Sequence, residues 1–463
     1  MCMQIQSHPY SATPFAALQS DAPVLSRGSG DRWGWPELFV AIQLLWGVVL
    51  FLPGAQGYRV YIRALPYLIS GAALIYYFRR PTGETIPASA RWLAACFVIL
   101  LLNLLQATTH LTAGIGQIVF QISIAAPAFW MVRAVSSERR LVTLVWVLFA
   151  SSFLASAVGI LQVYFPDTFL PPEFSALAQA LNPDVIGSLT YVGADGRAII
   201  RPPGLSDNPG GASVAGMMTM ILGVTLAVQR RQTWLVKAIC LSGGAIGMTA
   251  LFLTQVRALS LLAAASVAVS ALLRFRQGRA VEGAAGVMAG VGLLAGAYVW
   301  AVSVGGEAVS DRFLGLVDGG VFRTFDESRG LFLRYTLAEL LYEFPLGAGL
   351  GRWGMMQVLF GDPTMWQAPP IHVEVQPTGW LLDGGVPLLI LNVGALAASL
   401  RYSYRVAVDA STCSLQDIAT VLLCAQLAIV TLCLTGAVFN TQLGIQFWAV
   451  TGALFGATRL RRA

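Results

Sequence analysis

The sequence predicts an all-α integral membrane protein with about twelve transmembrane helices. Of its 463 residues, 56% are hydrophobic and only 11% are charged, whereas soluble domains carry about 25% charged residues. The apolar residues also gather into runs of roughly 20, the length that crosses a bilayer core as a helix. The low charge is the stronger argument, because a soluble core alone can raise the apolar content.

Twelve apolar runs are long enough to span a membrane. Pro66 weakens the prediction of the second span, since proline disrupts a helix interior. Only a tight turn separates the seventh span from the eighth. In chain order the predicted spans are 36–53, 62–78, 92–109, 113–133, 141–164, 212–229, 234–253, 258–274, 281–303, 386–402, 418–435 and 440–457.

Basic residues predict the orientation. Small basic groups follow the even-numbered spans, and with twelve spans they all fall on one side, which the positive-inside rule identifies as the cytoplasm. Both termini would then be cytoplasmic. The residues concerned are Arg79, Arg80, Arg91, Arg133, Arg139, Arg140, Arg230, Arg231, Lys237, Arg274, Arg276, Arg279, Arg401, Arg405, Arg459, Arg461 and Arg462.

Composition also argues against other classes. The net charge of +6 could indicate nucleic-acid binding, but the basic residues lie between apolar runs, as membrane topology requires. The six cysteines form no CxxC and no metal-ligand spacing with histidine, so we interpret them as small hydrophobic residues. Residues 1–35 are polar and lack the order of a signal peptide. We expect a disordered cytoplasmic tail there and a membrane domain over 36–463.

Two long segments, 165–211 and 304–385, would face outward. Loops of this length are usually functional or disordered, and these contain aromatic residues, glycines and prolines in place of low-complexity runs, which favours order. In the second we expect a helix at about 328–343. Pro345 would end it, because the residue before a proline avoids the helical conformation.

The first outer segment ends in a candidate anion site. Two prolines stiffen the chain after Arg201, and Asn208 and Pro209 could cap and begin the sixth span. The N-terminus of that helix would point free N–H groups outward, where they attract anions. An arginine beside such a terminus suits a phosphate. The alternative for Arg201 is an anchor to lipid headgroups.

Two further outer arginines are candidates. Arg257 lies in the tight turn between the seventh and eighth spans, where the orientation rule disfavours arginine, so a partner is expected. Arg334 lies on the predicted outer helix, and its spacing to Glu339 gives poor ion-pair geometry. A snorkelling interfacial arginine and a surface arginine are the respective alternatives.

His372 is the candidate base. It lies in the outer segment with Arg334, just before the chain returns to the membrane. A neutral imidazole can take a proton from a sugar hydroxyl, and Glu374 could orient the ring or replace it as the base. A structural histidine is the alternative. No predicted span has an ionisable residue near its middle, as ion-coupled transporters usually need.

These motifs together resemble the O-antigen ligase and O-antigen polymerase superfamily. The resemblance covers about residues 195–400 and rests on four stretches in order. They are Arg201-Pro-Pro-Gly-Leu-Ser-Asp-Asn-Pro209, Thr254-Gln-Val-Arg257, Arg334 with Glu343-Phe-Pro-Leu-Gly-Ala-Gly-Leu-Gly351, and His372 with Leu382-Asp-Gly-Gly-Val-Pro-Leu-Leu389.

The resemblance implies a GT-C-like, metal-independent inverting glycosyltransferase of the bacterial inner membrane, with no cofactor and a periplasmic active site. Such enzymes transfer a glycan from an undecaprenyl-diphosphate-linked donor in O-antigen, lipopolysaccharide or exopolysaccharide biosynthesis. Arg201 and Arg334 would hold the diphosphate, Arg257 and Asn208 would bind substrate, and His372 would serve as base or orient the acceptor. Lipid A–core, another repeat unit and a protein all stay open as acceptors.

The chain departs from the family pattern on the acceptor side. Val373 follows the histidine in place of asparagine, "LDGG" replaces "ELG", and Pro377 is expected to interrupt a helix. Two rival functions stay open: a lipid-linked oligosaccharide flippase or other transporter, and a scaffold of envelope assembly. The short link from Gln229 to Trp234 between the two halves of the chain speaks against one large class of flippases.

Overall fold

The computed structural model describes residues 34–79, 85–170, 190–206, 210–230, 232–362, 364–410 and 412–459. Within these ranges the chain is helical apart from loops and one two-stranded sheet. Eight helices are, by length and composition, able to cross a membrane, so the protein is an all-α, multi-pass membrane protein. Nearly all of the predicted tail lies outside the described residues, and its disorder stays a prediction.

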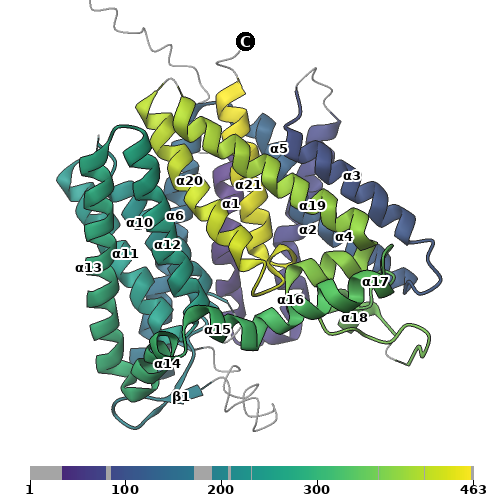
Figure 1. Ribbon diagram of the computed structural model, residues 1–463, viewed down its shortest axis with the longest axis horizontal. Coiled ribbons are helices and arrows are strands. Elements are labelled where there is room, and N and C mark those ends of the chain that lie inside the picture. The colour runs from purple at the N-terminus through teal and green to yellow at the C-terminus, as the bar shows by residue number, and fades with distance from the viewer. Residues whose placement is uncertain are drawn as a thin grey trace, which may run out of the picture. The chain divides into compact units, whose positions relative to one another are not determined.

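Each of the twelve predicted spans overlaps a helix (Figure 1). The eight long helical stretches are α2 (Arg59–Phe78), α4 with α5 (Leu111–Ala125 and Pro127–Ala134), α6 (Glu138–Tyr164), α11 (Trp234–Thr254), α12 (Arg257–Arg276), α13 (Ala280–Gly305), α19 (Gln376–Asp409) and α20 (Cys413–Leu432). The others are α1 with η1 (Trp35–Leu45 and Trp46–Phe51), α3 (Ala88–Asn103), α10 (Ala212–Ala227) and α21 (Gln442–Arg459).

Local sequence explains where several helices begin. Ser137, Thr233 and Thr412 precede α6, α11 and α20, and each side chain accepts a backbone N–H from the first turn, as N-cap residues do. Pro66 lies inside α2 without ending it. Proline is tolerated in membrane helices where neighbouring groups compensate for the lost hydrogen bond.

Small residues bring α10 and α11 together. A Cβ atom added at Gly216 would lie 2.6 Å from the Gly247 carbonyl oxygen, and one at Gly223 would lie 2.5 Å from the Cys240 carbonyl oxygen. The two backbones therefore touch directly, which is the usual way membrane helices pack. This contact places the N-terminus of α10 beside the C-terminus of α11, and hence beside the turn that leads to Arg257.

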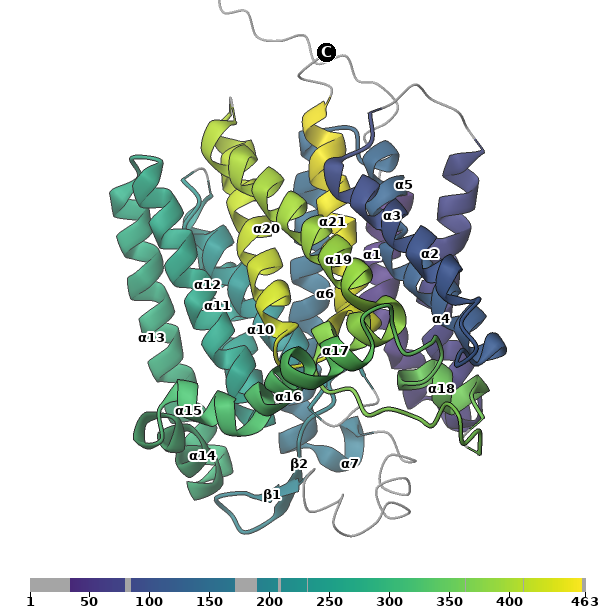
Figure 2. The same cartoon turned by 45° about the vertical axis from the view of Figure 1, so that its right-hand side comes forward.

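The segment after α13, which is expected to face outward, contains more helix than the one helix predicted there. The helix expected at 328–343 is part of a helical stretch that ends at Glu343, where Phe344 leaves the helical conformation before Pro345. Figures 1 and 2 place this stretch at the end of the bundle opposite the C-terminal end of α21. Its elements are α14 (Glu307–Asp318), α15 (Val321–Phe325), η3 (Asp326–Gly330), α16 (Leu331–Tyr335), η4 (Thr336–Leu340), α17 (Leu341–Glu343) and α18 (Gly354–Phe360).

The first outer segment contains the sheet. β1 (Thr190–Val192) pairs antiparallel with β2 (Ala198–Ile200), with Tyr191 opposite Ile199. The Ala194 N–H, in the hairpin turn, donates to the carbonyl of Val304 at the end of α13 at 2.9 Å. The hairpin is thereby attached beside the start of α14.

The expectation that Pro377 interrupts a helix is wrong. Pro377 lies in the first turn of α19, where the missing N–H would have no helical partner in any case. The break comes later, at Gly384 and Gly385, whose backbone angles are not helical. A glycine hinge therefore precedes the main apolar run of α19.

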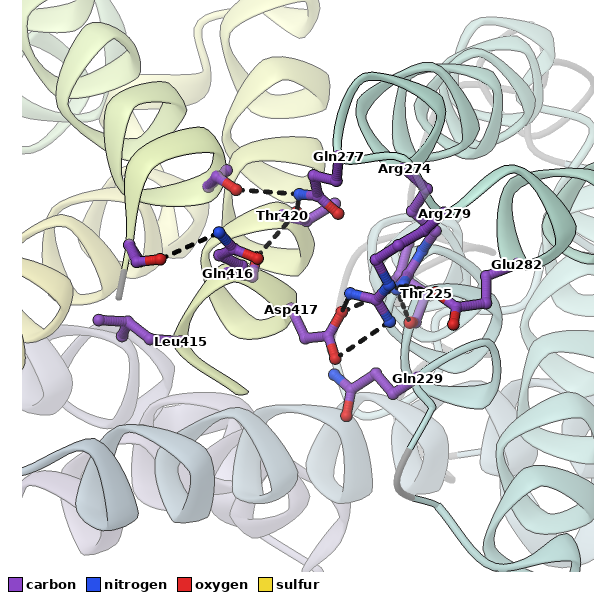
Figure 3. A network of polar contacts seen from close by, with 12 residues as sticks. Thr225, Gln229, Arg274, Gln277, Arg279, Glu282, Leu415, Gln416, Asp417 and Thr420 are labelled. Atoms are coloured by element: carbon purple, nitrogen blue, oxygen red, sulfur yellow. Dashed lines mark hydrogen bonds and ion pairs between the residues drawn. The ribbon is translucent and has the colours of Figure 1, made fainter. Parts of the chain in front are cut away.

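A charged network lies at the other end of α12 from Arg257 (Figure 3). Arg274 and Arg279 both donate to the Asp417 carboxylate, Arg274 at 3.1 Å, and Glu282 lies 3.7 Å from Arg274. Arg274 also donates to the Thr225 carbonyl at 3.1 Å. Two arginines here face two acids, so the charges are balanced within the protein and the network joins α10, α12, α13 and α20.

Candidate functional site

Arg201 is held in place by a clamped turn. It follows β2 directly, and Gly204 three residues later has a φ of +63°. The Gln162 side chain of α6 clamps this glycine: it accepts the Gly204 N–H and donates to the Gly204 carbonyl, both at 2.8 Å. The Arg201 carbonyl accepts the Gly210 N–H at 3.0 Å. These bonds fix Arg201 between α6 and the start of α10.

Hydrogen bonds from Arg257 and Arg312 connect the α11–α12 turn to α14. Gln255 takes the left-handed conformation, with φ +56°, and so makes the tight turn from α11 to α12. The Arg312 Nε, on α14, donates to the Gln255 carbonyl at 3.0 Å, and an Arg257 Nη donates to the Arg312 carbonyl at 3.4 Å. Both guanidinium groups therefore keep N–H groups that these bonds leave free.

These three side chains, Arg201, Arg257 and Arg312, form what we call the arginine cluster. Burial lowers the pKa of the Arg312 guanidinium, and the positive charges of Arg201 and Arg257 lower it further. Burial also lowers the pKa of Arg201, whose Nε is buried without a hydrogen-bond partner. All three stay charged near neutral pH, because arginine does not deprotonate in proteins.

The arginine cluster differs from the network of Figure 3 in having no acid. Within the described ranges, none of its three members forms an ion pair with a carboxylate, whereas Arg274 and Arg279 share Asp417. Gathering three half-buried positive charges without compensation is unfavourable. An anion with several oxygen atoms would relieve that cost through charge-assisted hydrogen bonds.

A second polar group, the histidine cluster, lies along the η3–α16 stretch. His372 Nε2 lies 2.7 Å from Glu374 Oε1, and Glu374 also forms an ion pair with Arg329. The His372 ring lies 6.1 Å from the Phe332 ring, centroid to centroid, and is 72% exposed. A carboxylate paired with Nε2 favours the tautomer that donates from Nε2, which leaves Nδ1 free to accept a proton.

Arg334 contacts an acid that the sequence did not suggest. Its Nη1 lies 3.1 Å from Asp326 Oδ2, and both side chains are more than half exposed. Glu339 and Glu343 are not its partners in the described part of the chain. The π-helical turns of η3 shift the helical register, so sequence spacing alone does not predict this pair.

Arg352 supports the segment that carries His372. Its guanidinium donates to the Pro369 carbonyl from Nε at 3.2 Å and Nη2 at 3.1 Å, and to the Ala348 carbonyl from Nη1 at 2.8 Å. The Ile371 N–H donates to the Arg352 carbonyl at 2.8 Å. Arg352 is only 5% exposed, so it serves to hold the chain just before His372.

The Pro/Gly-rich turn, residues 345–351, packs against the glycine hinge of α19. The Ala348 N–H donates to the Leu382 carbonyl at 2.8 Å, and the Val386 N–H donates to the Pro345 carbonyl at 2.9 Å. Gly347 lies against Gly384 so closely that an added Cβ would lie 3.1 Å from its backbone. Two motifs that are separate in sequence are therefore one packed unit.

Asp383 occupies the centre of that unit. It is fully buried and accepts hydrogen bonds from Trp353 Nε1 at 2.8 Å and from the Gln117 and Gln121 side chains at 3.0 Å. Asp383 lies just before the predicted tenth span, which began at 386. The helix itself begins at Gln376 and includes this aspartate.

The structure brings together some of the predicted site residues and separates others. Arg201 and Arg257 meet in the arginine cluster, and His372 and Glu374 meet in the histidine cluster with Arg334 nearby on α16. No hydrogen bond or ion pair among the described residues joins the two clusters. Asn208 and Pro209 lie outside the described residues, and α10 begins at Ala212 with Gly211 as its N-cap, later than predicted.

Sequence reasoning missed Arg312, Arg329 and Arg352. Their position in the sequence could have indicated them, because all three lie in the segment 304–385. That segment is predicted to face outward, where the orientation rule disfavours arginine. Applying to them the argument used for Arg257 would have made them candidates. Asp383 was visible in the "LDGG" motif, but its partners Gln117 and Gln121 are more than 260 residues away.

No three His, Cys, Asp or Glu side chains in the described ranges gather as metal ligands would. A scan against known protein families and a search of curated protein sequences find no match for this chain.

Proposed function

We propose that this protein transfers a glycan from an undecaprenyl-diphosphate-linked donor to a hydroxyl acceptor at the periplasmic face of a bacterial inner membrane. The observation that carries the proposal is the acid-free arginine cluster. Three arginines from three different segments converge there, and a diphosphate supplies the multiple anionic oxygens that guanidinium groups bind best.

The second support is the histidine cluster at the same end of the molecule. Figure 2 shows α14, which carries Arg312, and α16, which carries Arg334, at that end. We assign the arginine cluster and Arg334 to the donor diphosphate, since a phosphate oxygen can replace the exposed Asp326 at Arg334. His372 acts as the base, and Glu374 and Arg329 orient it.

The proposed reaction is a single inverting displacement. The acceptor hydroxyl oxygen forms a bond to the anomeric carbon while the bond from that carbon to the donor phosphate oxygen breaks. The hydroxyl proton passes to Nδ1 of His372. The leaving undecaprenyl diphosphate gains negative charge, which the arginine cluster stabilises, and such electrostatic stabilisation is usually the largest single contribution to catalysis. The arginines take the charge-stabilising role that a metal ion has in other phosphate sites.

The membrane arrangement in this proposal has twelve spans in a GT-C-like fold. The eight long helices and four shorter ones could supply the spans, and the basic residues after even-numbered spans support a cytoplasmic position for both termini. The two clusters then face the periplasm. Surface polysaccharide polymerisation and ligation are the pathways that fit; lipid A–core, a lipid-linked repeat unit or a protein could each be the acceptor.

Reconstitution tests the proposal. The full chain in proteoliposomes would receive an undecaprenyl-diphosphate-linked glycan and, in separate reactions, each class of acceptor. A new glycosidic product together with released undecaprenyl diphosphate is the expected result. Movement of the donor between leaflets without product would instead identify a flippase. Neither product nor movement, with any acceptor class, would leave a scaffold role.

A further inference from the structure

The far end of the bundle holds a cavity that the proposed reaction does not use. Its volume is about 270 Å³, close to the roughly 300 Å³ at which small-molecule pockets begin. It lies between the start of α3, the C-terminal half of α19 and α21, and its lining includes Ser89, Ala398, Arg401, Arg405 and Phe455. α19 begins near the histidine cluster and reaches this cavity near its other end.

Three features of the cavity favour a phosphate group. Arg401 and Arg405 lie one helical turn apart on α19, and neither forms an ion pair within the part of the chain that the structure describes. The first N–H groups of α3 have no side-chain cap, because Pro87 is its N-cap. Helix N-termini and arginines are the two common phosphate ligands in proteins.

Ser89 gives independent support. It is 3% exposed and lines the cavity, so its hydroxyl can donate a hydrogen bond to a group bound there. A phosphate oxygen seated between Ser89 and the two arginines would accept that bond.

The surroundings favour a lipid over a free phosphate. Along the contact between α3 and α19, three apolar side chains are exposed: Trp92 is 40% exposed, Ile390 58% and Val393 52%. The Trp92 ring packs against Gly394, where an added Cβ would lie 3.0 Å away. This apolar surface can hold acyl chains while the cavity holds the headgroup.

We propose that the cavity between α3, α19 and α21 binds the phosphate headgroup of an anionic phospholipid. The two arginines neutralise the lipid charge, the α3 N-terminus and Ser89 donate hydrogen bonds, and the acyl chains lie along α3 and α19. Anionic lipids of the inner leaflet commonly attract such basic groups. The site is independent of the glycan-transfer proposal.

Native mass spectrometry of the purified full chain tests the site. Dioleoylphosphatidylglycerol should bind and raise the unfolding temperature, whereas dioleoylphosphatidylcholine and inorganic phosphate should do neither. The double variant Arg401→Gln/Arg405→Gln should weaken phosphatidylglycerol binding at least about tenfold, since each lost charge-assisted bond costs that order. The matched control Arg230→Gln/Lys237→Gln removes two charges away from the cavity and should bind as the unmodified chain does.

A second variant keeps the charge and fills the space. Ala398→Phe should weaken phosphatidylglycerol binding by a similar factor, because Ala398 lines the cavity. The proposal is overturned if both cavity variants bind phosphatidylglycerol as the unmodified chain does, if the control loses as much binding as the double variant, or if inorganic phosphate alone gives the same thermal shift.

Discussion

Arg201 offers a ligand both a positive charge and a planar set of N–H donors, and the two properties can be tested separately. Its buried Nε has no partner, and the clamp on Gly204 fixes the backbone from which it projects. A buried, unpaired N–H is costly, and a diphosphate oxygen would satisfy it. The cluster therefore depends on the planar fork of arginine as well as on its positive charge.

Arg201→Lys tests this dependence. Lysine keeps the charge but loses the bidentate geometry, so we expect kcat to fall about tenfold or more, with Arg201→Ala falling further. Turnover of the lipid-linked donor in proteoliposomes is the measurement. The control is Arg197→Lys, an exposed neighbour paired with Asp195, which should keep its rate. Equal activity of Arg201→Lys and the unmodified chain would show that only charge matters.

Substitutions of His372 and of Glu374 are expected to lower kcat by different amounts. If His372 is the base, His372→Ala should lower kcat by about 10²- to 10⁴-fold. Glu374→Gln, which keeps the side-chain shape, should cost much less, because it only weakens the orientation of the ring. The pH–rate profile of each variant is the second readout. The reverse order of losses would make Glu374 the base and His372 its partner.

At the scale of elements, the glycine hinge of α19 explains how distant motifs cooperate. The hinge interrupts the helix and packs against the Pro/Gly-rich turn. Beside it, Asp383 accepts three hydrogen bonds, two from glutamines of α4 and one from Trp353. The order of these motifs was visible in sequence. Their docking was not, because it depends on backbone contacts between segments and on partners more than 260 residues apart.

Gly385→Ala tests the hinge. Gly385 has a φ of +65°, and an added Cβ would lie 2.2 Å from the Pro345 carbonyl oxygen, so we expect a loss of more than about 1 kcal/mol in the free energy of unfolding. Thermal unfolding of purified protein measures it. The matched control is Gly292→Ala on α13, where a Cβ meets nothing within 4 Å and should be neutral or stabilising. Equal unfolding temperatures for the two variants would contradict the packed hinge.

At the scale of the whole molecule, the fold was the most predictable part. Apolar runs and low charge predict helices in a membrane whatever their packing, and every predicted span overlaps a helix. The site was predictable only in part. Arg201, Arg257 and His372 were found because each stands out locally, but the convergence of Arg312 on the first two depends on how α14 docks against the α11–α12 turn.

The orientation of the molecule is open to direct labelling. Arg323 is an exposed residue of the outer segment, and Cys413 is an exposed native cysteine at the start of α20. In intact cells, a membrane-impermeant maleimide should label the Arg323→Cys variant but not the unmodified chain. Permeabilised cells should label Cys413 in both. Labelling of the unmodified chain in intact cells would contradict the predicted topology.

The most direct test of the arginine cluster as the donor site uses Arg312, the member that only the structure identifies. Turnover of an undecaprenyl-diphosphate-linked donor would be compared between Arg312→Ala and Arg323→Ala, whose residue lies in the same outer segment but pairs with Glu327 in solvent. We predict a loss of about 100-fold or more for Arg312→Ala and a change within about twofold for Arg323→Ala. Equal rates for the two folded variants would contradict the assignment.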